Sequence, residues 1–333
     1  MRRREFLTGL TVATTVGAGA WPARADAEPA PETTTITLRD APFACLAPQY
    51  FAEELLKAEG FTDIRFVKLS DTSFPTLKKA VASGEINFIT NDMLGWLMSL
   101  DGDASTVVLA GVHAGCFELF GTGAVRSILD LKGKRVSVAS LGGSRRVFIS
   151  LMAASVGLDP SKDINWVVQP IREGMQFLVE GKVDAFLGFP PEPQELRAKK
   201  IGRVLVNTLT DRPWSQYFCC LLGASREFVQ KYPVATKRAL RAILKAADVC
   251  AVEPERVARF VVDRGFVPNY DSTLQALKEL GYRHWRTYNP EETVRFYALR
   301  LHEVGFIKSN PQKLIAQGTN WRFVNELKKE LKG

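Results

Sequence analysis

The segment that offers the clearest chemistry is residues 140–146, which read SLGGSRR. Gly142 and Gly143 let the backbone come close to a bound group, and the helix predicted to follow would present free N–H groups and the positive end of its dipole. Ser144 adds a hydroxyl, and Arg145 adds a guanidinium fork that suits an oxyanion. The segment therefore predicts an anion site. The alternative is a plain tight turn with its arginines in solvent.

Carboxylates in or near the other predicted loops indicate a different ligand chemistry. They accept hydrogen bonds from amino groups, so two or more of them in one cleft would favour an amine-bearing or aminopyrimidine ligand. Aspartate also caps helices, and that is the better interpretation of Asp92. Asn91 lies beside it and is included among the candidates. The carboxylates concerned are Asp40, Asp92, Glu118 and Glu192.

Aromatic side chains could form the apolar walls that ligand pockets combine with a few placed polar groups. Each ring could instead belong to the core. Trp214 is the strongest candidate because it follows Arg212 and Pro213 near a predicted hinge. Phe43, Phe189 and Trp214 complete the predicted ligand-binding set, and Phe117 and Tyr217 are further candidates for the walls.

Little in the sequence supports an enzyme or a metal site. The three histidines are widely spaced, and no HExxH, G-x-S-x-G or P-loop sequence is present. His113 and Glu118 could in principle do acid–base work, but a polar cluster at a hinge is the simpler interpretation. The five cysteines have neither zinc-type nor CxxC spacing. We therefore predict no catalytic residue, no metal and no cofactor.

The cysteines leave one further possibility open. Cys116 could lie beside Cys219 or Cys220, and a disulfide between them would restrain a hinge. Buried free thiols are the commoner outcome in apolar surroundings.

An internal duplication of about 100 residues indicates the elements that position these side chains. Each unit is predicted to run strand, helix, strand, helix, strand, which is typical of a mostly parallel sheet covered by helices. The matching pairs are residues 36–38 and 136–138, 63–67 and 163–167, and 77–88 and 175–186.

We therefore predict two α/β lobes joined by a two-segment hinge. Lobe one would contain residues 33–116 and 220–333, and lobe two would contain residues 117–219. Ligands of open α/β sheets bind beyond the carboxyl ends of the strands. This rule predicts one cleft formed by four loops, at residues 39–45, 90–93, 140–146 and 188–192.

The chain after residue 225 is predicted to be helical and is assigned mainly to lobe one. Several of the helices start with proline, which suits the first helical turn. Their predicted ranges are residues 233–252, 254–263, 270–279, 290–304 and 321–331.

Three segments resemble the SsuA/THI5-like (NMT1-type) solute-binding proteins: residues 129–136 (LDLKGKRV), 157–160 (GLDP) and 181–186 (GKVDAF). The resemblance covers roughly residues 33–250. It implies a type II periplasmic-binding-protein fold with ligand in the interlobe cleft, and delivery of that ligand to an ABC importer. Members of the family carry nitrate, taurine, alkanesulfonates, bicarbonate or thiamine-type pyrimidines.

The N-terminal residues predict export. MRRREFL precedes an uncharged stretch and then small residues, which is typical of a signal peptide of the twin-arginine type over residues 1–27, cleaved near Ala25 or Ala27. As a helix, residues 7–21 would span roughly 22 Å, less than the roughly 30 Å hydrocarbon core. Without residues 1–27 the chain stays moderately basic, and its charges are interspersed with no run of like sign, so no nucleic-acid partner is predicted.

The sequence thus predicts a monomeric, periplasmic solute-binding component of an ABC importer. It would bind a small organic or inorganic anion of the nitrate, sulfonate or carboxylate type and meet a permease in the inner membrane. It would not be an enzyme. The alternatives are a binding protein for a thiamine-type aminopyrimidine, a THI5-like pyrimidine-synthesising enzyme, and a ligand sensor for a membrane receptor.

Overall fold

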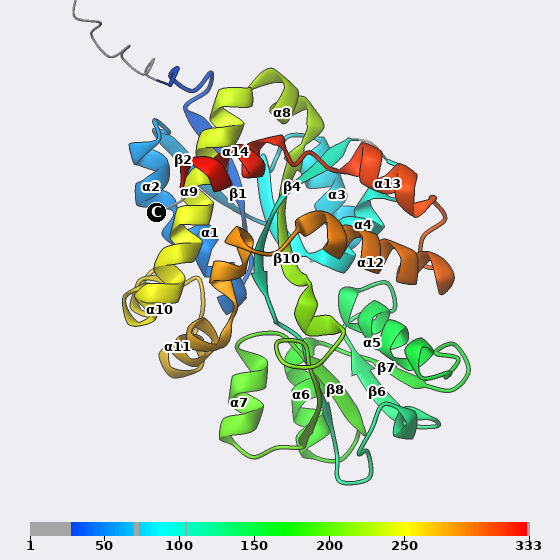
Figure 1. Cartoon of the computed structure of the whole chain (residues 1–333). Coiled ribbons are helices and arrows are strands. Elements are labelled where there is room, and N and C mark those ends of the chain that lie inside the picture. Colours follow the sequence, from blue (N-terminus) through cyan, green and yellow to red (C-terminus); the bar gives the residue numbers. More distant parts are fainter. Residues whose placement is uncertain (1–27, 70–72, 104, 332–333) are drawn as a thin grey trace, which may run out of the picture.

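A computed structural model of the protein describes residues 28–69, 73–103 and 105–331 (Figure 1). The predicted signal peptide lies outside the described residues. Two five-stranded sheets, each covered by helices, form two α/β units, which we call lobe one and lobe two. No described helix combines the length and the apolar composition needed to cross a bilayer.

The sheet of lobe one has the order β2-β1-β3-β10-β4. The first three strands are parallel, and β10 runs antiparallel between β3 and β4. Both β4 and β10 are buried along their whole length. This is expected for β10, a central strand, whereas β4 lies at the edge of the sheet and is covered there by later segments, with single bridges to Gly281 and Thr319. The strands are β1 (Thr35–Asp40), β2 (Asp63–Lys68), β3 (Phe88–Asp92), β4 (Thr106–Ala114) and β10 (Phe218–Ser225).

The sheet of lobe two repeats this arrangement with the order β7-β6-β8-β5-β9. Its first three strands are again parallel, and β5 runs antiparallel between β8 and β9. The duplication read from the sequence therefore corresponds to the same strand order in both sheets. The strands are β5 (Glu118–Gly121), β6 (Arg135–Val138), β7 (Asn165–Val168), β8 (Ala185–Gly188) and β9 (Arg203–Asn207).

Helices follow the strands in both lobes. Those of lobe one are η1 (Ala44–Leu46), α1 (Ala47–Phe51), α2 (Glu53–Ala58), α3 (Phe74–Ala82) and α4 (Met93–Leu100). Those of lobe two and the return crossing are η2 (Leu129–Leu131), α5 (Ser144–Ser155), α6 (Ile171–Val179), α7 (Glu192–Ala198) and η3 (Trp214–Gln216).

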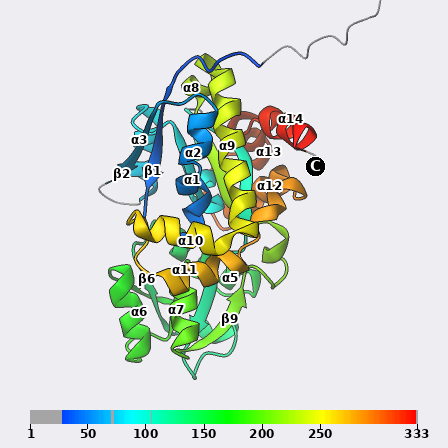
Figure 2. The same cartoon turned by 90° about the vertical axis from the view of Figure 1, so that its left-hand side faces the viewer.

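The C-terminal part is helical as predicted, and it packs on lobe one. The long helix α9 lies against α1 and α2, and α14 lies beside it (Figure 2). Three helices have the predicted bounds, α12 ends one residue earlier than predicted, and α8 and α13 were not predicted. The helices are α8 (Arg226–Lys231), α9 (Pro233–Val252), α10 (Pro254–Asp263), α11 (Tyr270–Glu279), η4 (Tyr282–Arg286), α12 (Pro290–Glu303), α13 (Pro311–Gly318) and α14 (Arg322–Glu330).

The two crossings between the lobes are hydrogen-bonded to each other. The backbone N–H groups of Cys116 and Phe117 donate to Thr208 Oγ1 at 3.1 and 3.0 Å. Gly115 has a φ of +69°, and a Cβ there would lie 2.6 Å from the Leu209 side chain. The sheets divide between β4 and β5 and between β9 and β10. The lobe boundaries at 116/117 and 219/220 stay a prediction.

Candidate ligand-binding site

An interlobe cavity of about 290 Å³ receives side chains from all four of the predicted cleft loops. Seven of the residues predicted to bind ligand line it: Phe43, Asn91, Asp92, Gly143, Ser144, Arg145 and Phe189. Five others do not line it: Asp40, Glu118, Gly142, Glu192 and Trp214.

The N-terminus of α5 opens into the interlobe cavity. Gly143, at the N-cap, has an extended backbone, and no side chain caps the helix. A Cβ at Gly143 would lie 2.8 Å from Ser140 Oγ, so a larger residue would require the exposed Ser140 side chain to turn away. Because the first N–H groups and the positive dipole end of a helix attract anions, this terminus is suited to an oxyanion.

Arg145 has its charge balanced within lobe two. Its Nη1 and Nη2 donate to the two carboxylate oxygens of Glu192 at 2.8 and 3.0 Å, and Nη1 also donates to the carbonyl of Leu187. The guanidinium lies 5.0 Å from the ring centre of Phe189, which forms part of the cavity wall. Arg145 therefore supports the cavity wall while its charge is paired with Glu192. Glu192 does not line the cavity and contributes by holding Arg145 in place.

Asp92 caps a helix, and this confirms the capping role that the sequence favoured for it. Its Oδ1 accepts from the Gly95 N–H at 2.9 Å at the start of α4. Its Oδ2 accepts from the Ser144 hydroxyl at 2.8 Å, and this bond joins lobe one to lobe two. Burial raises the pKa of Asp92 to about 6, although these two hydrogen bonds oppose the rise. Each oxygen already accepts one hydrogen bond, so Asp92 is a weaker partner for an amine than an unpaired carboxylate would be.

Sequence reasoning missed one charged residue of the cavity. Arg39, the penultimate residue of β1, is 3% exposed, and its Nη1 donates to Asn91 Oδ1 at 3.0 Å. Burial lowers the pKa of its guanidinium. Its place at the carboxyl end of a strand was a signal that could have found it. The other lining residues that were missed are Cys45, Leu46, Ser73, Phe74, Ala139, Ser140, Ile171 and Cys220.

Two of the predicted residues have other surroundings. Trp214 is buried, with its ring centre 5.1 Å from that of Phe148. Glu118 lies 3.2 Å from Arg197 and lines a separate cavity behind the hinge. Burial raises the pKa of Glu118 to about 7.

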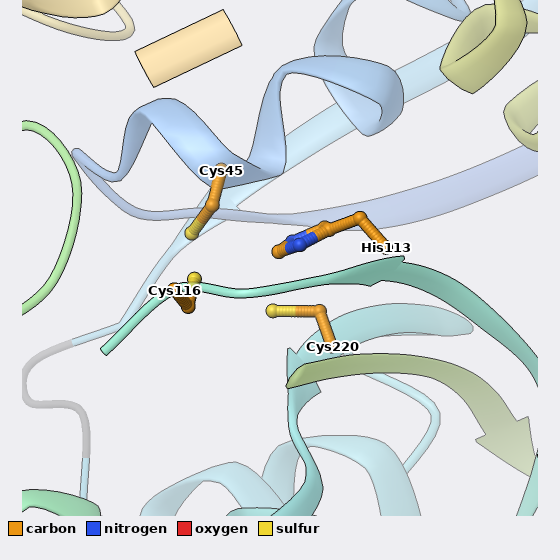
Figure 3. Close-up of side chains that lie close together, drawn as sticks. All are labelled: Cys45, His113, Cys116 and Cys220. Carbon is orange, nitrogen blue, oxygen red and sulfur yellow. The ribbon is translucent and has the colours of Figure 1, made fainter. Parts of the chain in front are cut away.

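Four side chains form a cysteine–histidine cluster under the interlobe cavity (Figure 3): Cys45, His113, Cys116 and Cys220. One ligand atom from each lies within 4.8 Å of the others, and all four residues are buried. All five cysteines of the chain are free thiols in the structure. Among the described residues, this cluster is the group that could hold a metal ion.

Comparison with known proteins identifies the family. The sequence profile of the NMT1-like family matches residues 89–262, more than half of the chain. The chain belongs to the NMT1-like family. Bicarbonate-binding protein CmpA of Synechococcus elongatus is 29% identical over 128 residues, which cover 38% of this chain and 28% of CmpA. This NMT1-like chain therefore matches less than a third of the length of that relative.

Solved structures confirm the predicted fold class of this NMT1-like protein. The periplasmic nitrate-binding protein NrtA of Synechocystis has a TM-score of 0.75 at 18% identity, with 91% of this chain and 90% of NrtA covered. The alkanesulfonate-binding protein SsuA of Xanthomonas axonopodis, bound to MOPS, has a TM-score of 0.68 at 16% identity, with 89% and 99% covered. These neighbours are binding proteins, and at such identities the likeness shows the fold alone.

Proposed function

We propose that this protein is the solute-binding component of an ABC importer and that it holds a small organic anion in the interlobe cavity. The observation that carries the proposal is the uncapped N-terminus of α5, which opens into a cavity with aromatic walls. The names of the relatives, which bind bicarbonate, nitrate and alkanesulfonates, agree with an anionic ligand. Export to the periplasm and contact with a permease belong to the same proposal.

The cavity walls favour an organic anion over a bare inorganic one. Phe43, Phe74 and Phe189 line the cavity together with Leu46 and Ile171. Its volume of about 290 Å³ is close to the lower end, about 300 Å³, of the range for small-molecule pockets. A nitrate or bicarbonate ion would leave most of this apolar surface without a partner. We therefore expect an anionic head at α5 and an apolar body between the rings.

The engaged carboxylates argue against an amine or aminopyrimidine ligand. Asp92 uses both oxygens within the protein, and Glu192 accepts from Arg145 and from the Phe189 N–H at 2.9 Å. Asp40 and Glu118 lie outside the cavity lining. An amino group in the cavity would thus find no carboxylate whose oxygens are both unpaired.

Binding is proposed to act by closing the lobes over the ligand. Contacts between the lobes already surround the cavity: Ser144 donates to Asp92, and the Ala44 N–H donates to the Pro190 carbonyl at 3.2 Å. The rings of Phe43 and Phe189 are in contact, with centres 5.8 Å apart and planes tilted by 43°. Ligand that bridges these surfaces would stabilise the closed form, which a permease could then recognise.

The experiment starts from a thermal-shift screen of alkanesulfonates, aliphatic and aromatic carboxylates, nitrate, bicarbonate and aminopyrimidines. The best ligand is then titrated calorimetrically against Ser140→Asp and its neutral match Ser140→Asn. Ser140 is an exposed residue of the cavity lining beside Gly143, so a carboxylate there would compete for the positive end of α5. We expect Ser140→Asp to weaken anion binding by roughly 10-fold, equal to about 1.4 kcal/mol, and Ser140→Asn to change it little.

Three results would contradict the proposal. If both variants bound the anion with equal affinity, the N-terminus of α5 would not be part of the binding site. If only aminopyrimidines shifted the melting temperature, the ligand would not be an anion. Chemical conversion of the bound molecule, instead of its recovery unchanged, would favour an enzyme.

A further inference from the structure

We propose that the cysteine–histidine cluster holds one zinc ion in a closed, structural site at the floor of the interlobe cavity. The four donor atoms lie within 4.8 Å of one another. In a tetrahedral zinc site with Zn–S distances of about 2.3 Å, the sulfur atoms are about 3.8 Å apart, so small side-chain rotations would complete the geometry. The side chains converge on one point from separate segments (Figure 3).

The surroundings of His113 independently indicate that its ring binds a metal ion. Its ring is fully buried, and Nδ1 lies 3.4 Å from the carbonyl oxygen of Ala114. A carbonyl oxygen only accepts, so this contact is a hydrogen bond in the tautomer that protonates Nδ1, and that tautomer leaves the lone pair on Nε2. Nε2 has no hydrogen-bond partner among the described residues. A metal ion would use this lone pair, and the Nδ1 contact would fix the ring, as is usual for histidine ligands of metals.

The charges nearby favour a divalent ion. Zinc with three thiolates and a neutral imidazole carries a net charge of −1. The buried guanidinium of Arg39 interacts electrostatically with Asp92 as well as with Cys45 and Cys220, so it offsets only part of the negative charge at the site. A monovalent copper ion in the same site would add one more negative charge to the interior.

The zinc site would link the cleft loop of residues 39–45 to the two strands at the hinge, β4 and β10. Cys45 lies in η1, Cys116 follows β4 on the outgoing crossing, and Cys220 lies on β10, which returns from lobe two. Cys45 and Cys220 also line the interlobe cavity. Four protein ligands leave no open coordination position, so the zinc would have a structural role. The inference does not rest on the anion proposal.

The test uses the reduced full chain with zinc alone, then with cobalt as a spectroscopic probe. After removal of loose metal, we expect one zinc per chain, and we expect the cobalt form to show thiolate charge-transfer absorption and intense tetrahedral d–d bands. Cys220→Ser and His113→Ala should lower zinc affinity by more than about 100-fold, because outer-shell changes alone cost 10–100-fold. Cys250→Ser is the matched control: it alters a buried cysteine of α9 outside the cluster and should bind zinc normally.

If Cys220→Ser or His113→Ala fails to fold, His113→Cys provides a second test. It keeps four donor atoms and should give a stronger cobalt–thiolate band. The inference is overturned if wild-type protein takes up no zinc, if Cys220→Ser and His113→Ala retain it, or if His113→Cys lacks the band. A disulfide between cluster cysteines in unfolded, unreduced protein would also overturn it. Each of these results would leave anion binding at α5 to be judged separately.

Discussion

Arg145 and Glu192 form an ion pair whose side chains are only 7% and 14% exposed. Glu192→Gln removes the negative charge but keeps the size of the side chain, so the guanidinium would remain buried without a counter-charge. Removing one partner of a buried pair costs several kcal/mol, and we expect the free energy of unfolding in urea to fall by about 3 kcal/mol.

The control at this scale is Glu303→Gln. Glu303 lies 2.8 Å from Arg300, but both side chains are more than 40% exposed, so less than about 0.5 kcal/mol should be lost. Equal losses in the two variants would show that solvent screens the Arg145 pair as well.

Residues at the carboxyl ends of strands could be predicted because the duplication indicated where the strands end. Gly143, Ser144 and Arg145 were named for the cavity on that basis and do line it. The pairing of Arg145 could not be predicted, since Glu192 is 47 residues away and follows a different strand. A charge in a loop sequence does not reveal whether another charge neutralises it.

Among the helices, α9 is capped by a distant residue. Tyr232, at its N-cap, makes no side-chain cap bond, but the Glu32 carboxylate accepts from the N–H groups of Val234 and Ala235 at 2.9 and 2.8 Å. Glu32→Ala should therefore lower the free energy of unfolding by about 1 kcal/mol at neutral pH.

The loss caused by Glu32→Ala should depend on pH. Burial raises the pKa of Glu32, but the hydrogen bonds from Val234 and Ala235 outweigh it, and the pKa lies below the ordinary value of 4.5. The folded state thus binds the proton less readily than the unfolded state, so the stabilisation is present above about pH 4.5 and is lost as the pH falls. Urea titrations should show the two proteins converging in acid. The difference for Glu32→Gln should be smaller but should have the same pH slope, because only Glu32 of the wild type titrates. A constant difference would contradict this assignment.

Helix bounds could be predicted where local signals were strong. Proline starts α9 and α10, and both have the predicted bounds. The helix α13 was missed although Asn310 and Pro311 mark its start, because eight residues are too few to establish a helical period. The cap from Glu32 lies 202 residues from Val234 and leaves no local trace.

At the scale of the whole molecule, Glu279, at the end of α11, joins the two lobes on the side away from α5. Its carboxylate accepts from Gln194 and Arg197 of α7 at 2.9 and 2.5 Å. Glu279→Gln removes the ion pair between the lobes, so the ligand-free protein should open further, and ligand affinity should fall by roughly 10-fold. Small-angle scattering and calorimetry measure the two effects.

Glu255→Gln provides the matched control. Glu255, in α10, pairs at 2.7 Å with Lys278, which neighbours Glu279 in α11, and both helices belong to lobe one. It should leave the radius of gyration and the affinity unchanged. An unaltered radius and affinity in Glu279→Gln would mean that this contact does not help to close the lobes.

The two-lobed architecture could be predicted because it repeats itself in the sequence. The cysteine–histidine cluster could not, since rules for metal sites depend on local spacing and its members lie between residues 45 and 220. Only the return of β10 into the sheet of lobe one brings Cys220 to the others.

That return also sets an order of folding. All five strands of lobe two come from one uninterrupted stretch, so its sheet can form while the chain is still being synthesised. Lobe one lacks the strand between β3 and β4 until residues 218–225 have left the ribosome, and the facing edges of β3 and β4 stay unpaired until then. We therefore expect the middle of the chain to fold first and the N-terminal strands, though made earliest, to reach their native sheet later.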